Sequence, residues 1–168
     1  MTELRIVPLD EDTAALLTRA SPTWAAALPA WRTSMMTGRS TLLVALARDR
    51  PVDARHGTPS TTRPSAVGVA QLVHADVPEV CNVGVLESRR GHGVGTALMA
   101  EAERRARPAD RLRLNVGLDN PAARRLYERL GYRPTGELQT TTYDYVDACG
   151  VTRAATETSE WMEKHLLR

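Results

Sequence analysis

The sequence predicts an α+β protein in α/β/α layers, with a mixed, mostly antiparallel central sheet of six to seven strands and helices on both faces. Two observations predict this class. Strand-like and helical segments follow the order strand, two helices, three strands, helix, strand, helix, two strands. Three of the strands also follow one another without a helix between them, and a hairpin signal lies between the last two, which favours antiparallel pairing.

The first part of the chain predicts two strands and two helices. Residues 5–9 have the apolar content of a short strand, and the acidic run at residues 10–12 can cap a helix that follows it. Residues 24–36 predict a second helix, which Pro29 interrupts or kinks. Residues 41–47 are apolar and predict the second strand.

Residues 48–64 predict a flexible loop within the domain. The segment contains three prolines and many polar residues, and Val52 is its only large aliphatic residue. A connection of this length within a compact domain is either a functional lid or a tolerated insertion. Strands are predicted on its far side at residues 66–74 and 80–86.

The remaining elements alternate between helix and strand and then end in a hairpin. Residues 96–106 combine high helix propensity with one apolar face, and residues 111–117 predict a strand. Residues 120–131 predict a helix that Asn-Pro opens and that a glycine closes. Strands are predicted at residues 139–146 and 151–160, joined by a turn.

Composition excludes several classes of protein. The 168 residues suit one domain over residues 1–168, and 42% hydrophobic with 25% charged residues is typical of globular proteins. The 22 basic residues nearly balance the 20 acidic ones, so binding to nucleic acid or to an anionic membrane by charge is not expected. No apolar run approaches the ~20 residues of a membrane span, and no secretory signal is evident. A cytoplasmic location is expected.

The two cysteines, Cys81 and Cys149, are too few for a disulfide scaffold or a four-cysteine metal site. No metal is expected. A buried strand cysteine is usually inert, and no histidine follows Cys81 in a nucleophile arrangement, so an acyl-enzyme is not favoured.

The most informative segment is a glycine-rich turn between a strand and a helix. It runs from Arg90 to Gly95 and contains three closely spaced glycines. Without side chains, successive backbone N–H groups can converge on one point, where the helix dipole also favours negative charge. A diphosphate fits such a site, and Arg90 supplies countercharge. The alternative is a merely tight connection, which would seldom need three glycines.

Two nucleotide-binding motifs fit this turn poorly. A Walker loop needs Gly-Lys followed by Ser or Thr, and the only lysine of the chain is Lys164. The dinucleotide fingerprint requires a third glycine where Thr96 stands, after Gly91 and Gly93. A protein that binds ATP or NAD is therefore a weaker alternative.

Two blocks of sequence resemble the GNAT superfamily of N-acetyltransferases. Residues 85–98 resemble its acetyl-coenzyme A loop, with the pattern Arg/Gln-x-x-Gly-x-Gly/Ala, and residues 114–132 resemble its later motif. The similarity covers most of residues 66–166. One departure is Glu87, where many members have proline, which affects the stiffness of the turn. The resemblance implies a GNAT-like fold.

The resemblance also implies acetyl-coenzyme A as cosubstrate. Backbone amides of residues 92–96 would bind the pyrophosphate, and the strand edge at residues 83–85 would pair with the pantetheine arm and leave an amide near the thioester carbonyl. The residues implied in binding are Val83, Gly84, Val85, Arg90, Gly91, His92, Gly93, Val94, Gly95, Thr96, Asn120 and Tyr127.

Three residues carry the expected chemistry. Asn120 is either the N-cap of its helix, a contact of the pantetheine, or both. Tyr127 matches the family tyrosine that protonates the departing thiolate, and the alternative is a core tyrosine. Glu79 is expected to share its strand face with Cys81, Val83 and Val85 and is the candidate general base, with His74 or a water wire as alternatives.

The implied reaction is direct transfer of the acetyl group to a primary amine, on a small molecule or on a protein or peptide, in a ternary complex. The alternative is a non-catalytic coenzyme A-binding sensor or regulatory module. The acceptor is open: acidic residues at 10–12 and Asp144 would favour a cation, and Trp24 and Trp31 would either line its pocket or pack in the core. The oligomeric state is open as well, a homodimer included.

Overall fold

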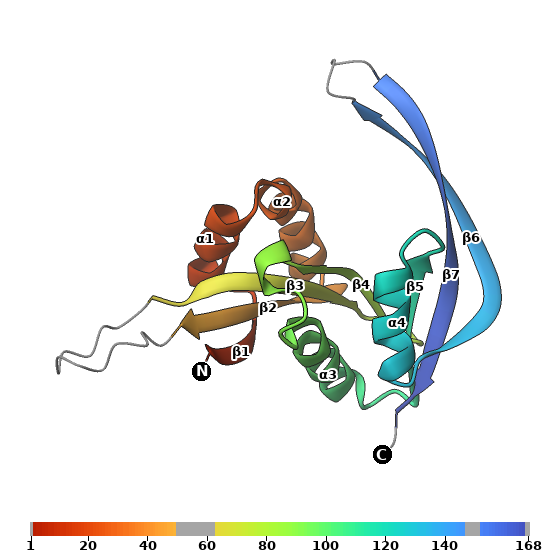
Figure 1. Ribbon diagram of the computed structural model, residues 1–168, viewed down its shortest axis with the longest axis horizontal. Helices are drawn as coiled ribbons and strands as arrows, with labels where there is room; N and C mark the ends of the chain where they lie inside the picture. Colours follow the sequence, from red (N-terminus) through yellow and green to blue (C-terminus); the bar gives the residue numbers. More distant parts are fainter. Residues whose placement is uncertain (1, 50–62, 147–151, 167–168) are drawn as a thin grey trace.

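The computed structural model describes residues 2–49, 63–146 and 152–166, and within them seven strands form one sheet (Figure 1). The strands are β1 (Thr2–Pro8), β2 (Ser40–Asp49), β3 (Ser65–Val73), β4 (Glu79–Val85), β5 (Arg111–Gly117), β6 (Arg133–Val146) and β7 (Thr152–His165). The helices are α1 (Glu11–Ala20), α2 (Pro22–Met36), α3 (Val94–Ala106) and α4 (Pro121–Arg129), and a 3-10 turn spans Glu87–Arg89.

The sheet is mixed, with the order β1-β2-β3-β4-β5-β7-β6. Only the pairing of β4 with β5 is parallel among the described strands, and all the other neighbours are antiparallel. The predicted sheet type is therefore confirmed. The parallel pair follows from the α3 crossover, because parallel strands need a long connection between them.

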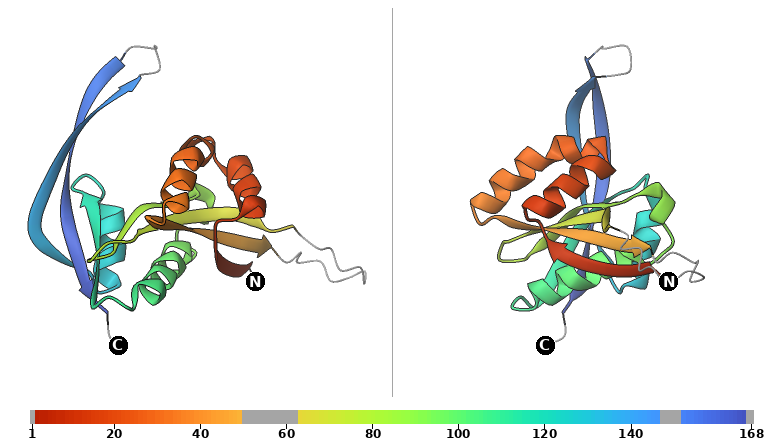
Figure 2. Two further views of the ribbon diagram at one scale, coloured as in Figure 1. Left: turned by 180° about the vertical axis from the view of Figure 1, so that it is seen from behind. Right: turned by 90° about the vertical axis from the view of Figure 1, so that its left-hand side faces the viewer.

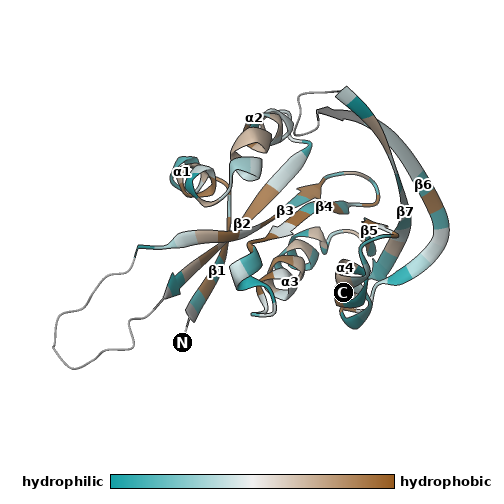
Figure 3. Cartoon of the chain, turned by 45° about the horizontal axis from the view of Figure 1, so that its top comes forward, coloured by the Kyte–Doolittle hydropathy of each residue, from teal (hydrophilic) through white to brown (hydrophobic). Residues whose placement is uncertain are grey.

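Helices cover both faces of the sheet, and each face has its own apolar core (Figures 2 and 3). On one face α1 and α2 bury Leu17, Trp24 and Trp31 against β2 and β3. On the other face α3 and α4 bury residues such as Leu98 and Tyr127 against the sheet. The two layers of helices are those predicted from the order of the elements.

Leu98 supports the second core, and its truncation is expected to destabilise the fold. The side chain is fully buried, and its Cδ1 lies 3.1 Å from the point that a Cβ on Gly68 would occupy. Leu98→Ala should lower the free energy of unfolding by about 2–5 kcal/mol, because it leaves a cavity in a close-packed layer. Urea unfolding measures this change. Leu138, which is 58% exposed, gives the control Leu138→Ala, expected within about 0.5 kcal/mol of the parent.

Two predicted boundaries in the first half were wrong. Helix α2 continues through Pro29 without interruption, because burial of Trp24, Leu28 and Trp31 on either side of the proline holds the helix against the sheet. The predicted loop at residues 48–64 begins too early, since β2 continues through Asp49, paired with Thr2 of β1. Residues 50–62 of that loop lie outside the described residues.

The last two strands are longer than predicted and form an arm that extends past the end of β5 (Figure 1). The pairing of β5 with β7 ends at Gly117 and Ser159, whereas β6 and β7 pair as far as Val146 and Thr152. Threonine hydroxyls face each other across the arm, as in the 3.1 Å contact between Thr142 and Thr156. The predicted turn at residues 147–150 lies outside the described residues.

Candidate active site

A cleft of about 970 Å³ opens where β4 ends. Its walls are the carboxyl end of β4, the loop that leads into α3, one face of α4 and the first turn of α2 with Trp24. This volume is at the upper end of the range for small-molecule and cofactor sites, about 300–1,000 Å³. The cleft is therefore large enough for an extended cosubstrate.

The cleft exists because β4 and β5 pair only at their beginnings. Glu79 lies opposite Arg113 and Val80 opposite Leu114, and beyond these two positions the strands separate. On its other side β4 stays paired with β3 as far as Val85. The backbone edge of residues 83–85 that faces the gap therefore has no β5 partner in the described sheet, and an extended ligand can pair with it as an added strand.

A β-bulge in β4 lies at the narrow end of this gap. Asn82 has φ +52°, and the pairing with β3 shifts register between Val69 and Gln71. The Asn82 side chain donates to Oε1 of buried Gln71 at 2.8 Å, and Gln71 Nε2 donates to the hydroxyl of Ser40 at 2.9 Å. Sequence reasoning missed Asn82, although asparagine is among the few residues that tolerate this conformation. The bulge re-aims the backbone where the strands diverge.

The glycine-rich turn has the geometry of an anion site. Gly91 and Gly93 have φ +76° and +80°, and Gly93 is the N-cap of α3. No acidic residue lies in the first turn of α3. A Cβ on Gly95 would come within 3.1 Å of Leu126 Cδ2, so glycine lets α3 approach α4 closely without a shift of the Leu126 side chain. The first amides of α3 and its dipole therefore face the cleft without a side chain in the way.

Most residues predicted to bind the cosubstrate line this one cleft. Gly84 sits against Trp24, whose Nε1 would be 3.2 Å from an added Cβ. His92 is the exception: its exposed ring turns back, with Nδ1 2.8 Å from the Arg90 carbonyl oxygen. The predicted residues that line the cleft are Val83, Gly84, Val85, Arg90, Gly91, Gly93, Val94, Gly95, Thr96, Asn120 and Tyr127.

Ten lining residues were not predicted as cosubstrate contacts, and Trp24, Leu126 and Arg129 are among them. Trp24 packs in the α1–α2 core but also reaches the cleft, while Leu126 and Arg129 reach it from α4. The helical spacing of Leu126 and Arg129 from Ala123 was the available signal, since positions three apart share a helix face. For Trp24 no local signal existed, because only the packing of α2 over the sheet brings it to β4.

Asn120 acts as a helix cap. Its Oδ1 accepts a hydrogen bond from the Ala123 N–H at 3.1 Å, and Pro121 follows it as the first helical residue. The residue also lines the cleft. The capping role is thus present, and the contact with a pantetheine stays a prediction.

Tyr127 lies on the buried face of α4. It is only 7% exposed, and its ring stands edge-on to fully buried Tyr132, with 6.1 Å between the ring centres. Burial raises the pKa of Tyr127 to about 12. The phenol therefore keeps its proton across the physiological range and can donate it toward the cleft.

Glu79 and Cys81 lie at the narrow end of the gap rather than among the residues that line the cleft. Burial raises the pKa of Glu79, and the Arg113 guanidinium, 3.9 Å away, partly opposes this. Burial, with the Glu79 charge, raises the pKa of the Cys81 thiol to about 11. Cys81 is therefore a poor nucleophile at neutral pH. Burial makes the Glu79 carboxylate a stronger base than an exposed carboxylate.

His74, the alternative base, is exposed and lies at the other end of the sheet from the cleft lining. Its Nε2 is 3.0 Å from the Thr41 hydroxyl. This contact places the ring beside β2, and His74 does not line the cleft. Glu79 is at the same end of the sheet, opposite Val73, and does not line the cleft either, but it stands on β4, which borders the gap. His74 is the weaker candidate because its ring lies on the β2 side, away from the gap.

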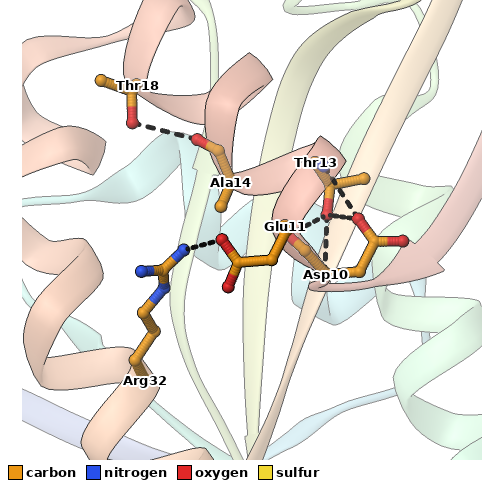
Figure 4. Close-up of polar contacts among 6 residues, drawn as sticks. All are labelled: Asp10, Glu11, Thr13, Ala14, Thr18 and Arg32. Atoms are coloured by element: carbon orange, nitrogen blue, oxygen red, sulfur yellow. Dashed lines mark hydrogen bonds and ion pairs between the residues drawn. The ribbon is translucent and has the colours of Figure 1, made fainter.

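The acidic run near the N-terminus serves the helices (Figure 4). Asp10 caps α1 by accepting from the Thr13 N–H at 2.8 Å, which lowers the pKa of Asp10. Glu11 pairs with Arg32 of α2 at 2.9 Å. These contacts are local, and none of the three acidic residues lines the cleft. Trp31 is buried in the core beneath the same helices, and the side chain of Asp144 lies outside the described part of the chain.

Two searches over the described residues gave negative results. Of the helices found in residues 2–49, 63–146 and 152–166, none combines the length and the apolar character that a membrane crossing requires. In the same part of the chain, histidine, cysteine and acidic side chains form no group of three that could hold a metal ion.

Comparison with known proteins identifies the family. The sequence profile of the acetyltransferase (GNAT) family matches residues 28–132, more than half of the chain. The chain belongs to this family. A mycothiol acetyltransferase from Nocardia farcinica is 44% identical over 73 residues, which are 42% of this chain and 23% of that protein. The chain thus matches about a quarter of that relative's length.

Solved structures support the fold independently. An IAA acetyltransferase from Bacillus cereus superposes with a TM-score of 0.62 at 18% identity, over 98% of this chain and 100% of the other. A GNAT family acetyltransferase from Elizabethkingia anophelis, with acetyl-CoA bound, gives 0.63 at 18% identity, over 97% and 98%. At this level of identity the similarity concerns the fold, and it confirms the predicted α+β GNAT architecture.

Proposed function

We propose that this GNAT protein transfers the acetyl group of acetyl-CoA directly to a primary amine, on a small molecule or on a peptide, within a ternary complex. The observation that carries the proposal is the gap between β4 and β5, which leads from the bulge at Asn82 to the first amides of α3. One continuous cleft joins a strand edge to an anion site, as a long cosubstrate with a thioester at one end and phosphates at the other requires.

Acetyl-CoA would lie along this cleft with its diphosphate at α3. Backbone amides between Gly91 and Thr96 would hold the phosphates, with Arg90 as countercharge. The pantetheine would pair with the open edge at residues 83–85, and an amide near the bulge would stabilise the oxyanion. Family membership and the acetyl-CoA bound to the E. anophelis relative support this placement.

The proposed chemistry divides two proton transfers between Glu79 and Tyr127. The acceptor nitrogen loses a proton to Glu79 and attacks the thioester carbon, so that a C–N bond forms and the C–S bond breaks. The thiolate then takes a proton from Tyr127. Burial raises the pKa of Tyr127 to about 12, so the phenol is protonated at neutral pH and available as the proton donor for the thiolate.

Acceptor-dependent release of free thiol from acetyl-CoA tests the proposal against its rival, a coenzyme A-binding sensor. Transfer predicts release that rises with amine concentration and stops when the amine is omitted. Tight binding of acetyl-CoA without amine-dependent release over a broad panel would support the sensor instead. Protection from thermal unfolding by ATP or NAD but not by coenzyme A would exclude both.

Glu79→Gln is expected to lower kcat roughly 30-fold, below the usual effect of a lost general base because water retains part of the role. Burial raises the pKa of Glu79, so kcat of the parent should fall with decreasing pH through a value above the ordinary carboxyl range of about 4.3. The variant should lack this limb in a pH profile of kcat.

Glu163→Gln provides the matched control. Glu163 lies on β7 and accepts hydrogen bonds from Arg111. Its replacement removes one carboxylate from the same face of the sheet and should change kcat by less than about twofold. An equal loss in both variants would mean that Glu79 acts only through the charge of this face.

A further inference from the structure

One face of β5 and β7 is left open beside the gap. Leu112, Leu114 and Val116 are buried in the α3–α4 core, so Arg113 and Asn115 point to the opposite face. On that side α1 and α2 pack mainly over β2 and β3 (Figure 1), and Trp24 of α2 also reaches Gly84 of β4. On this face of β5 and β7 the polar side chains therefore pack against one another rather than under a helix. We call this surface the β5 platform: Glu79, Arg113, Asn115 and Trp161.

Arg113 is a partly covered cation that makes no hydrogen bond with any described residue. Its guanidinium stacks on the Trp161 ring, 4.3 Å from the ring centre, and its Nε is buried without a partner among the described residues. The contact of Nη2 with Glu79, at 3.9 Å, is too long for a hydrogen bond. By contrast, Arg111 and Arg124 donate hydrogen bonds to carboxylates. A guanidinium with unused donors, fixed on an aromatic ring, is suited to an anion from outside.

Asn115 adds an unused acceptor next to this cation. Its Nδ2 donates to Gln139 Oε1 at 3.0 Å, whereas its Oδ1 is buried and accepts from no described residue. Asn115 also follows Leu114, the last position of β5 that pairs with β4. The free oxygen thus lies where the strands separate, and a buried carbonyl there calls for an N–H donor.

The two unused groups lie close together on the platform. Asn115 is directly opposite Trp161, and the Arg113 guanidinium covers that same ring. Although Arg113 and Asn115 are about 7 Å apart along the strand, the arginine side chain therefore leans toward the row of Asn115. An acceptor for N–H and a donor for an anion then lie within the span of one short molecule.

We propose that the acceptor substrate carries a carboxylate near its amine, as a free amino acid does. This inference rests on the proposed acetyl transfer. Arg113 binds the carboxylate, and Asn115 Oδ1 accepts an N–H of the amine as it faces the thioester. A polycation is disfavoured, because the charges of Glu79 and Glu163 on this face are balanced by Arg111 and Arg113. Among the described residues Arg113 meets a carboxylate only in the 3.9 Å ion pair with Glu79 and makes no hydrogen bond, so its donors remain available for the carboxylate of a substrate.

The test compares each L-amino acid with its own carboxamide, with spermidine as a polycation, in the thiol-release assay. For at least one amino acid, kcat/KM should exceed that of its carboxamide by tenfold or more. One charge-assisted hydrogen-bonded pair contributes a factor of about this size. Arg113→Gln should raise KM for that amino acid about tenfold and leave its carboxamide within about twofold. Arg113→Lys should retain part of the preference, because it keeps the charge but not the planar fork.

Arg111→Gln is the matched control, two positions earlier on the same face and already paired with Glu163. It should leave the preference for the carboxylate intact. Equal kcat/KM for acid and amide, a preference for spermidine, or an equal loss for both substrates in Arg113→Gln would each overturn the inference while the proposed transfer stands. Binding of acetyl-CoA without thiol release for any amine would instead refute the transfer, and the inference with it.

Discussion

Tyr127→Phe is expected to lower kcat about 300-fold, within the range that a general acid contributes. The change removes one oxygen from a buried residue that lines the cleft, so the thiolate loses its proton donor while the packing of α4 remains. Binding of acetyl-CoA, measured by calorimetry, should stay within about twofold of the parent, because the phenol acts on charge that develops only during the reaction. Steady-state thiol release at saturating substrate measures kcat, and single-turnover release measures the chemical step by itself.

Tyr132→Phe is the control for this experiment. Tyr132 is fully buried beside Tyr127 but does not line the cleft. It should retain kcat within about threefold, since its hydroxyl reaches no substrate. The general-acid role of Tyr127 would be rejected if both variants lost activity alike or if Tyr127→Phe kept most of it.

Gly93→Val is expected to weaken acetyl-CoA binding at least about 100-fold, equivalent to about 2.7 kcal/mol. Gly93 has φ +80° and begins α3. A β-branched residue resists this conformation, so the turn must rearrange and its amides no longer converge on the diphosphate. Calorimetric titration with acetyl-CoA measures the loss.

Gly38→Val separates strain from binding. Gly38 has a similar φ of +68° and stands in open space after α2, away from the cleft. Both variants should lose stability of about 1–3 kcal/mol from backbone strain, but only Gly93→Val should lose affinity. If both bound acetyl-CoA as the parent does, the proposed phosphate site would be in the wrong place.

The sequence predicts this site well where its chemistry depends on backbone conformation. Gly91 and Gly93 are needed for positive φ, and Asn120 before a proline favours a helix start, so each acts through its neighbours in the chain. Alternation assigns residues to faces along β5. It fails along β4, where the bulge at Asn82 puts Val83 and Val85 on the α3–α4 side with Val80 and leaves Glu79 on the opposite face. The eleven predicted residues that line the cleft follow from the resemblance to the family rather than from these local signals.

Other features depend on packing between distant segments. Trp24 reaches the cleft only because the packing of α2 on the sheet sets its ring against Gly84 of β4. The strain at Asn82 is stabilised by Gln71 and Ser40 from other strands. The extent of β6 and β7 was underestimated at residues 133–138 and 161–165. Pro134 and Gly136 in the first of these segments are typical of a loop, and the pairing of β6 with β7 is irregular between Pro134 and Leu138. Pairing between them, rather than burial, sets their length.

The placement of β7 between β5 and β6 has a consequence for how the chain folds. The strand β5 meets this neighbour only after α4 and β6 have intervened, so its contacts close a loop of high sequence separation. During synthesis the layer from β1 to α3 can collapse early, whereas β5 keeps an unpaired edge until the ribosome has released β7. While the β5 edge is unpaired, it can pair with a strand of another nascent chain, and misassembly would be most damaging at this stage.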